Sequence, residues 1–324
     1  MLINKKYNDC LSLKSRTELD NLKNSLITEL SNLEFDKKES SFADIKLLSA
    51  KLIKNLGAKE KITGFSWGIK EMDIATNGIE EERFIVIGAL KKSGKTRFAA
   101  HIQRMIQQQG GVCIFKSLEM ASYDLMKLQL AAESEISDRL IKSGGLLKKY
   151  QISKILALKD QIDWEKMPIE TGTLKKEMIT PTLRRYSKLY AGCVVIIDFI
   201  QRIYYDKSRG ASELEEIAMM IGDAVREFKI TVIVLSQLAN TAESEKPDIG
   251  HLKGSGGIAE NADIIILLDN IFRRTKKEDD KNKLNITIQQ RYGETSEFKV
   301  FADLGKCQFK DYSSSLSVLE RVQS

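Results

Sequence analysis

Residues 84–96 read Phe84-Ile-Val-Ile-Gly-Ala89-Leu-Lys-Lys-Ser-Gly94-Lys95-Thr96, which predicts an apolar strand, a loop and the start of a helix. The loop fits the pattern Gly-x-x-x-x-Gly-Lys-Thr, with Ala89 at the position of the first glycine. In such a loop, successive backbone N–H groups surround phosphate groups, and the helix dipole adds positive potential. A chance Gly-Lys-Thr in a lysine-rich chain is the alternative, and the flanking strand and helix argue against it.

Individual positions of this phosphate loop have separate chemical roles. Gly94 allows the backbone to approach a phosphate closely, Lys95 reaches the terminal phosphates, and Thr96 offers its hydroxyl to Mg²⁺. We therefore expect ATP and Mg²⁺ as ligands. The predicted nucleotide-binding residues are Ala89, Lys92, Ser93, Gly94, Lys95, Thr96 and Arg97. Lys92 has an equally good interpretation as a solvated loop charge.

The rest of the chain alternates strands with helices. Strands are predicted at 84–88, 112–117, 193–199, 231–238, 263–269, 285–290 and 298–302. The first five are continuous apolar runs, as expected of strands that helices cover on both faces. Helices are predicted at 95–108, 121–133 and 212–228, with another from Thr180 that has Pro181 at its first position. This alternation predicts an α/β fold with a mainly parallel central sheet flanked by helices.

One turn and two loops connect further predicted elements. Tyr292-Gly293-Glu294 separates the last two strands and predicts an antiparallel hairpin at the sheet edge. The charged run 273–283 predicts a solvated loop, and the polar, glycine-containing stretch 240–257 predicts a second one.

Composition limits the class of protein. The chain has 324 residues, 42% hydrophobic and 30% charged, with a net charge of +6, so it has enough apolar residues for a core. This charge permits a nucleic-acid partner without arguing for one. No stretch approaches the length of a membrane span, and the start lacks the apolar core of a signal peptide. Cys113 and Cys193 lie in apolar runs and predict buried free thiols. We expect a cytoplasmic protein, bacterial or in the host of a phage or plasmid.

Three predicted strands end in polar residues that suit a nucleotide site. Glu119 follows the strand beside the phosphate loop, where it can orient and deprotonate an attacking water. Asp198 ends an apolar run and can hold Mg²⁺ together with Thr96. Gln237 can sense the terminal phosphate. The alternatives are a helix N-terminal charge, a turn cap and a backbone-bonded glutamine, respectively, and the phosphate loop in the same chain favours the functional roles.

The N-terminal region is expected to add helices to this core. Residues 1–40 predict a helical segment, and 41–58 predict a second helix with Ile45, Leu48, Leu52 and Leu56 on one face. These faces suit packing on the same chain or on a neighbouring subunit. The ATPase domain is expected at 59–313, followed by a tail at 314–324.

Together these motifs resemble the motor domain of DnaB-type replicative DNA helicases. The matching segments, in the family's order, are 63–65 with Asp73 and Gly78, then 88–96, 117–120, 197–201, 236–238 and 254–263. They span about residues 60–312. The resemblance implies a RecA-like fold, a homo-hexameric ring around single-stranded DNA, and ATP-driven translocation and unwinding. It makes 41–58 a linker helix that docks on the next subunit. A primase, a helicase loader or a replication-initiation protein are the implied partners.

The resemblance also assigns residues. ATP is expected between subunits, with Arg291 supplied by a neighbour as a finger on the transferred phosphoryl group. The DNA-backbone contacts are expected from Lys207, Arg209, Lys253, Gly254 and Gly256. An exposed hairpin arginine without catalytic function is the alternative for Arg291.

Three departures from the family pattern stand out. Gln289 replaces a lysine two residues before Arg291, the loop after Gln237 lacks arginines, and residues 1–60 are too short for the family's N-terminal collar. The alternative functions are therefore a RecA-like DNA-associated ATPase that acts as a loader or regulator, or a slowly hydrolysing scaffold.

Overall fold

The computed structural model describes residues 62–203, 210–239, 245–252 and 255–312. The predicted helices before residue 62 and the predicted tail lie outside these ranges, so their docking and boundaries stay predictions.

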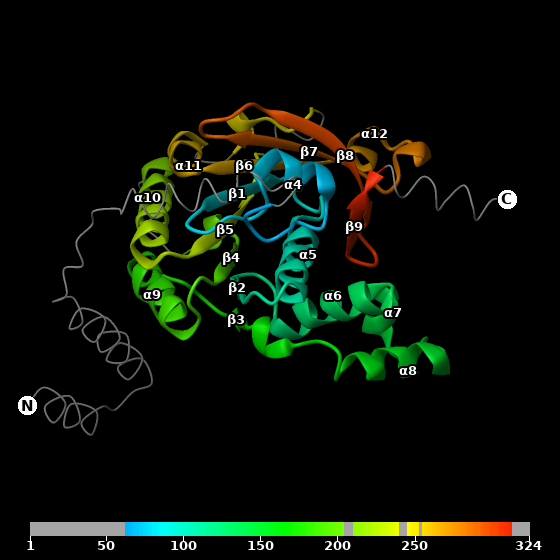
Figure 1. Cartoon of the computed structure of the whole chain (residues 1–324). Helices are drawn as coiled ribbons and strands as arrows, with labels where there is room; N and C mark the ends of the chain where they lie inside the picture. Colours follow the sequence, from blue (N-terminus) through cyan, green and yellow to red (C-terminus); the bar gives the residue numbers. More distant parts are fainter. Residues whose placement is uncertain (1–61, 204–209, 240–244, 253–254, 313–324) are drawn as a thin grey trace, which may run out of the picture.

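One nine-stranded sheet organises the described residues, in the order β3-β2-β4-β5-β1-β6-β7-β8-β9 (Figure 1). The strands are β1 (Phe84–Ala89), β2 (Cys113–Ser117), β3 (Ile169–Thr171), β4 (Val194–Asp198), β5 (Thr231–Gln237), β6 (Ile264–Asn270), β7 (Lys283–Gln290), β8 (Ser296–Asp303) and β9 (Gln308–Asp311). Strands β1 to β6 are parallel, whereas β7, β8 and β9 are antiparallel. The carboxyl ends of the parallel strands share one edge, where ligands bind in open α/β sheets.

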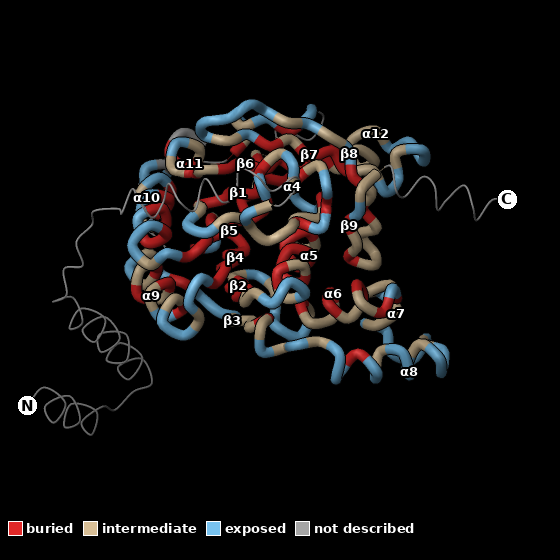
Figure 2. Tube along the Cα trace, viewed as in Figure 1, coloured by how far each residue is buried: buried red, intermediate tan, exposed pale blue. Residues whose placement is uncertain are grey.

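Helices cover both faces of this sheet. The helices are α4 (Lys70–Thr76), α5 (Lys95–Gln108), α6 (Ser122–Ser134), α7 (Asp138–Ser143), α8 (Lys149–Leu158), α9 (Ile179–Leu189), α10 (Ala211–Phe228), α11 (Ser255–Asn261) and α12 (Ile271–Thr275). One apolar layer joins the sheet to α4, α5 and α6, and the other joins it to α9, α10 and α11. Figure 2 shows the buried residues concentrated in the sheet and in α5. The continuous apolar strands of the sequence are therefore explained by burial on both faces.

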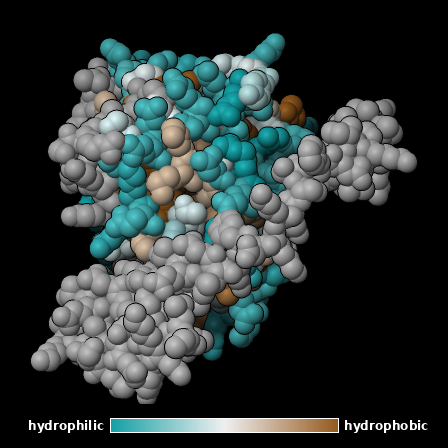
Figure 3. All heavy atoms as spheres, turned by 90° about the vertical axis from the view of Figure 1, so that its left-hand side faces the viewer, coloured by the Kyte–Doolittle hydropathy of each residue, from teal (hydrophilic) through white to brown (hydrophobic). Residues whose placement is uncertain are grey.

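The outer helices are less buried than the core. Leu158 is the buried residue of α8, whereas Leu146, Tyr150 and Leu156 are 71%, 66% and 66% exposed. On the face turned to the viewer in Figure 3, the coloured surface is mainly hydrophilic, with a few apolar residues near its centre. Among the described residues, no helix is long and apolar enough to cross a membrane.

The predicted elements agree closely with the structure, with local corrections. All seven predicted strands are present, and so is the antiparallel hairpin between β7 and β8. Cys113 and Cys193 are buried and free, as predicted. Helix α9 begins at Ile179, after a 3₁₀ turn at Lys176–Met178, so Pro181 is its third residue. A proline is tolerated there because the first N–H groups of a helix have no partner within it.

Two predicted loops contain helices. Gly256 lies in α11, and a Cβ on the next residue, Gly257, would come within 2.2 Å of Glu215 on α10. The glycine pattern thus permits close packing of two helices here. The charged run after β6 begins with α12, where the Asn270 side chain accepts a hydrogen bond from the backbone of Arg273. Charge alone did not reveal this cap.

Candidate functional site: a nucleotide-binding edge

The phosphate loop connects β1 to α5 at the carboxyl edge of the sheet. Lys92 and Gly94 have positive φ angles of 64° and 97°, and α5 begins at Lys95. The Ser93 N–H donates to the carbonyl of Leu90 at 3.2 Å, which closes the turn. Glycine is favoured at position 94 for two reasons. Its φ angle is positive, and a Cβ there would lie 2.7 Å from Leu304 Cδ2. The loop therefore has the backbone form that the sequence predicts.

Thr96 and Asp198 meet directly at this edge. The Thr96 hydroxyl donates to Asp198 Oδ2 at 2.7 Å, across 102 positions of sequence. Asp198 is fully buried at the end of β4, and its Oδ1 has no hydrogen-bond partner among the described residues. A buried carboxylate oxygen without a partner is costly unless a ligand satisfies it. A hydroxyl beside a carboxylate is a donor set that suits Mg²⁺, so the residues fit the predicted metal.

Burial also shifts the pKa values of both charged groups at the centre. It raises the pKa of Asp198 above its ordinary value, although Lys95 and the Thr96 hydrogen bond act in the opposite direction. Burial lowers the pKa of Lys95 from 10.5 to about 8, against the attraction of Asp198 and Glu119. The Lys95 ammonium lies 4.4 Å from the centre of the Phe199 ring. Lys95 is thus held in the low-polarity environment that strengthens contacts to phosphate.

Glu119 stands on the turn that leaves β2. The turn is fixed because Ser117 Oγ donates to the Met120 carbonyl at 2.7 Å and accepts from its N–H at 2.9 Å. The Leu118 N–H donates to the Asp198 carbonyl at 2.8 Å, which ties the turn to the end of β4. The Glu119 side chain is 45% exposed. A carboxylate at this edge, close enough to attract Lys95, suits the predicted base.

Gln237 ends β5 and is paired in register with Ala89. Its backbone N–H donates to Gln201 Oε1 at 3.2 Å, and Gln201 Nε2 donates to Ser236 Oγ at 2.9 Å. Gln201 follows β4, so it bridges the ends of β4 and β5. Gln201 belongs to the predicted motif 197–201 but had no predicted role there, and only the strand order reveals the bridge.

The other predicted nucleotide-binding residues differ in their surroundings. Ala89 and Ser93 are buried, whereas Lys92 is exposed. Arg97 points to a different group, because its guanidinium pairs with Asp138 at 2.6 Å and donates to the Leu304 carbonyl at 2.5 Å. These contacts give Arg97 a structural function, and its role toward a nucleotide stays a prediction.

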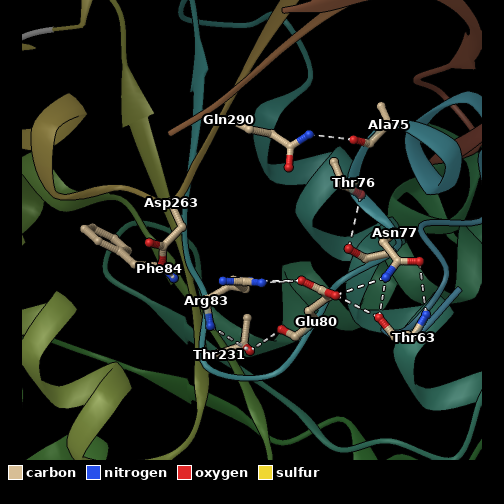
Figure 4. A network of polar contacts seen from close by, with 11 residues as sticks. Thr63, Ala75, Thr76, Asn77, Glu80, Arg83, Phe84, Thr231, Asp263 and Gln290 are labelled. Atoms are coloured by element: carbon tan, nitrogen blue, oxygen red, sulfur yellow. Dashed lines mark hydrogen bonds and ion pairs between the residues drawn. The ribbon is translucent and has the colours of Figure 1, made fainter. Parts of the chain in front are cut away.

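Arg291 lies at the amino ends of the parallel strands, whereas the phosphate loop lies at their carboxyl ends. Its N–H donates to the Asp263 carbonyl at 2.9 Å, and Asp263 exchanges hydrogen bonds with Phe84 at the start of β1. Figure 4 shows Asp263 beside Phe84, and Gln290 bonded to the Ala75 carbonyl on α4. The length of β1, roughly 17 Å at ~3.3 Å per residue, therefore separates Arg291 from its own chain's loop.

The Arg291 guanidinium has partners at this edge. It donates to the Glu260 carbonyl and lies 3.6 Å from Asp263 Oδ1. The structure therefore separates Arg291 from Lys95, Thr96, Asp198 and Glu119, which it brings together. Gln289, two residues before Arg291 and near the end of β7, is exposed and lines a cavity of about 430 Å³ beside residues 246–249.

The predicted DNA-binding residues are mostly outside the described ranges. Lys207, Arg209, Lys253 and Gly254 fall there, and Gly256 is part of α11. Arg202, which was not among the predicted site residues, has its guanidinium 3.6 Å from the Glu119 carboxylate. The spacing of these residues in the sequence does not predict the contact, because Glu119 lies on the turn after β2 and Arg202 on the 3₁₀ turn after β4.

Similar proteins match most of the chain. The family model described as "DnaB-like helicase C terminal domain" matches residues 64–311. The "Replicative DNA helicase DnaC" of Bacillus subtilis (strain 168) is 29% identical over 284 residues, which cover 79% of this chain and 59% of that protein. The "Replicative DNA helicase DnaB" of Geobacillus stearothermophilus is 27% identical over 303 residues, covering 85% and 63%. The chain thus spans less than two thirds of the length of these two relatives.

Two solved structures share the fold. One is described as an ATPase domain and aligns with a TM-score of 0.76 and 23% identity, covering 84% of this chain and 99% of that one. The other is described as a DnaB-like replicative helicase and its interactions with primase, and aligns with a TM-score of 0.76 and 22% identity, covering 90% and 71%. These likenesses establish the RecA-like fold, and the match over residues 64–311 establishes that the chain belongs to the DnaB-like helicase C-terminal domain family.

Proposed function

We propose that this protein hydrolyses ATP to translocate on single-stranded DNA and to unwind duplex DNA during replication. The observation that carries the proposal is the arrangement around Asp198. A buried carboxylate bonds Thr96, keeps one oxygen without a partner among the described residues, and lies beside Lys95 and Glu119. A site built in this way suits a metal-bound nucleoside triphosphate.

Each residue of the site has a defined task in hydrolysis. The backbone of the phosphate loop and the Lys95 ammonium bind and orient the phosphates, and the apolar surroundings of Lys95 exclude water. Thr96 and Asp198 hold Mg²⁺, which supplies positive charge to the transferred phosphoryl group. Glu119 accepts a proton from the attacking water, and Gln237 reports the loss of the terminal phosphate through the Gln201 bridge.

The position of Arg291 supports a site completed by a second subunit. Within one chain the length of β1 separates it from the loop, so it can act on a nucleotide only from a neighbour. We propose a homo-hexameric ring in which each Arg291 serves the next subunit's site. The exposed apolar side chains of α8 offer a surface of matching chemistry for the predicted linker helix, 41–58.

The DNA and protein partners follow from the family. We propose that the loops carrying Lys207, Arg209 and Lys253 face single-stranded DNA and bind its backbone without sequence preference. A primase, a loader or an initiation protein would join the ring, and replication places this work in the bacterial or host cytoplasm.

Gln289 supports a second candidate function. It brings no charge to the position two residues before Arg291, where the family usually has a lysine. A DNA-associated ATPase that hydrolyses slowly, as a loader, regulator or scaffold, would tolerate that loss.

The deciding experiment measures ATP turnover with and without single-stranded DNA, together with duplex unwinding and the mass of the assembled particle. The proposal expects a hexamer, turnover that rises with DNA, and unwinding that requires ATP. A monomer with turnover independent of DNA would contradict it, and a DNA-stimulated oligomer without unwinding would favour the loader or scaffold.

A further inference from the structure

Arg202 is a charged residue beside the nucleotide site, and none of the proposed roles involves it. It ends the 3₁₀ turn η3 (Ile200–Arg202), directly after the Asp198 strand. Its N–H donates to the Phe199 carbonyl at 2.9 Å, and both neighbours are fixed. Gln201 bridges the ends of β4 and β5, and Ile203 is buried. The backbone of Arg202 is thus anchored to the edge that carries Asp198.

The side chain of Arg202 reaches across the edge to Glu119. Its Nη2 lies 3.6 Å from Glu119 Oε1, and its guanidinium lies 5.8 Å from the centre of the Phe199 ring. The Lys95 ammonium contacts the same ring at 4.4 Å. Arg202, Phe199, Lys95 and Glu119 therefore form one connected cluster at the phosphate loop.

Stability does not explain this contact. Arg202 and Glu119 are 54% and 45% exposed, and an ion pair with such exposure contributes little to folding. The ion pair matters more for the orientation of Glu119 than for stability. Glu119 lies on an exposed turn, and Arg202 supplies a charged partner for its carboxylate. A general base is effective only when it is held in the correct orientation toward the water.

We propose that Arg202 is a positioning residue for ATP hydrolysis, which holds the Glu119 carboxylate toward the attacking water. The inference rests on the proposed function of Glu119 as the base. In this role Arg202 acts through Glu119 and not directly on the nucleotide or the water. It follows that its loss lowers turnover and leaves nucleotide affinity unchanged.

The test compares Arg202→Gln, Arg202→Lys and Glu119→Gln in the full chain, by phosphate release and by binding of a fluorescent ATP analogue. We expect Arg202→Gln to lower kcat about tenfold with an unchanged KM, as for a misplaced catalytic group. Arg202→Lys keeps the charge and should recover most of the rate. Arg226→Gln is the matched control, because Arg226 forms an exposed pair with Asp223 on α10.

A double variant tests whether Arg202 acts on turnover through Glu119. In the Glu119→Gln background, adding Arg202→Gln should cause no further loss in a single-turnover assay, since two residues of one unit are not additive. A further loss there, a raised KM, or wild-type kcat in Arg202→Gln would each overturn the role of Arg202. Wild-type turnover in Glu119→Gln would instead overturn the proposed base, a result distinguishable from the others.

Discussion

At the scale of single residues, burial determines the chemistry of the site. Asp198 and Lys95 carry opposite charges, and burial shifts the pKa of each toward its neutral form. Their mutual attraction and the Thr96 hydrogen bond keep both groups in the same small volume. A ligand that brings both a cation and phosphate oxygens satisfies the two groups together, which is the property of a metal-bound nucleotide.

The first prediction concerns Lys95. The Lys95→Ala variant should lose ATP turnover, because Lys95 is the buried loop cation beside Asp198 and Glu119, where the terminal phosphates are expected to bind. Phosphate release over time measures the effect, with Lys142→Ala on exposed α7 as the control. Turnover at the wild-type rate in Lys95→Ala would contradict the assignment of the loop.

At the scale of elements, α5 carries a titratable residue that connects the loop helix to the rest of the core. His101 is fully buried, and its Nε2 lies 2.9 Å from the Trp67 carbonyl, while Arg104 Nη2 lies 3.1 Å from its Nδ1. These partners fit a neutral ring that donates through Nε2 and accepts through Nδ1. Burial and Arg104 lower the pKa of His101 from 6.5 to about 3.

The second prediction is a loss of stability in mild acid. Below pH ~6.5 the unfolded chain binds a proton at His101 that the folded chain does not bind, so stability falls as the pH drops toward 3. Between pH 7.5 and 5, the wild type should lose about 2 kcal/mol more than His101→Gln, at ~1.4 kcal/mol per pH unit. Urea unfolding at both pH values gives the comparison. Equal losses in the two proteins would exclude His101 as the cause.

At the scale of the whole molecule, the sheet separates the two halves of the proposed catalytic site. The phosphate loop lies at the carboxyl edge, whereas Arg291 lies at the amino edge beside Asp263 and Phe84. A single chain therefore holds both halves without being able to join them, and assembly becomes a requirement for the proposed hydrolysis.

The third prediction is that Arg291→Ala binds ATP as the wild type does but does not turn it over. The arginine stabilises charge that develops in the transition state, so its loss acts on kcat. Binding of a fluorescent ATP analogue and phosphate release separate the two effects. Unchanged kcat would remove the proposed finger.

The fourth prediction uses subunit mixing. Lys95→Ala and Arg291→Ala chains should each be inactive alone, and an equal mixture should regain activity. With random mixing, about a quarter of the interfaces are intact, because an intact interface needs Lys95 from one subunit and Arg291 from its neighbour. Phosphate release after joint refolding or subunit exchange measures the gain. A mixture that stays inactive, although mass measurement shows mixed particles, would argue against sites shared between subunits.

Local sequence signals predicted five of the six parallel strands and the loop between β1 and α5, because continuous apolar runs and the spacing of Gly94, Lys95 and Thr96 are local features. They also pointed to Asp198 and Glu119, since both follow such strands. They did not predict the short edge strands β3 and β9 or the helices α4, α7, α8, α11 and α12, most of which are too brief to show a clear pattern. The family match confirmed the resemblance that these motifs carried.

Which of these residues lie close together depends on the packing of the whole sheet. Strand order brings β4 between β2 and β5, and this order places Asp198 against Thr96, Gln201 across β5, and Arg202 beside Glu119. The antiparallel direction of β7 places Arg291 at the opposite ends of the strands, because Gln290 pairs with Ile264 at the start of β6. Local sequence encodes the element that carries a side chain, whereas its neighbours depend on long-range strand pairing, in which residues about 100 positions apart become adjacent.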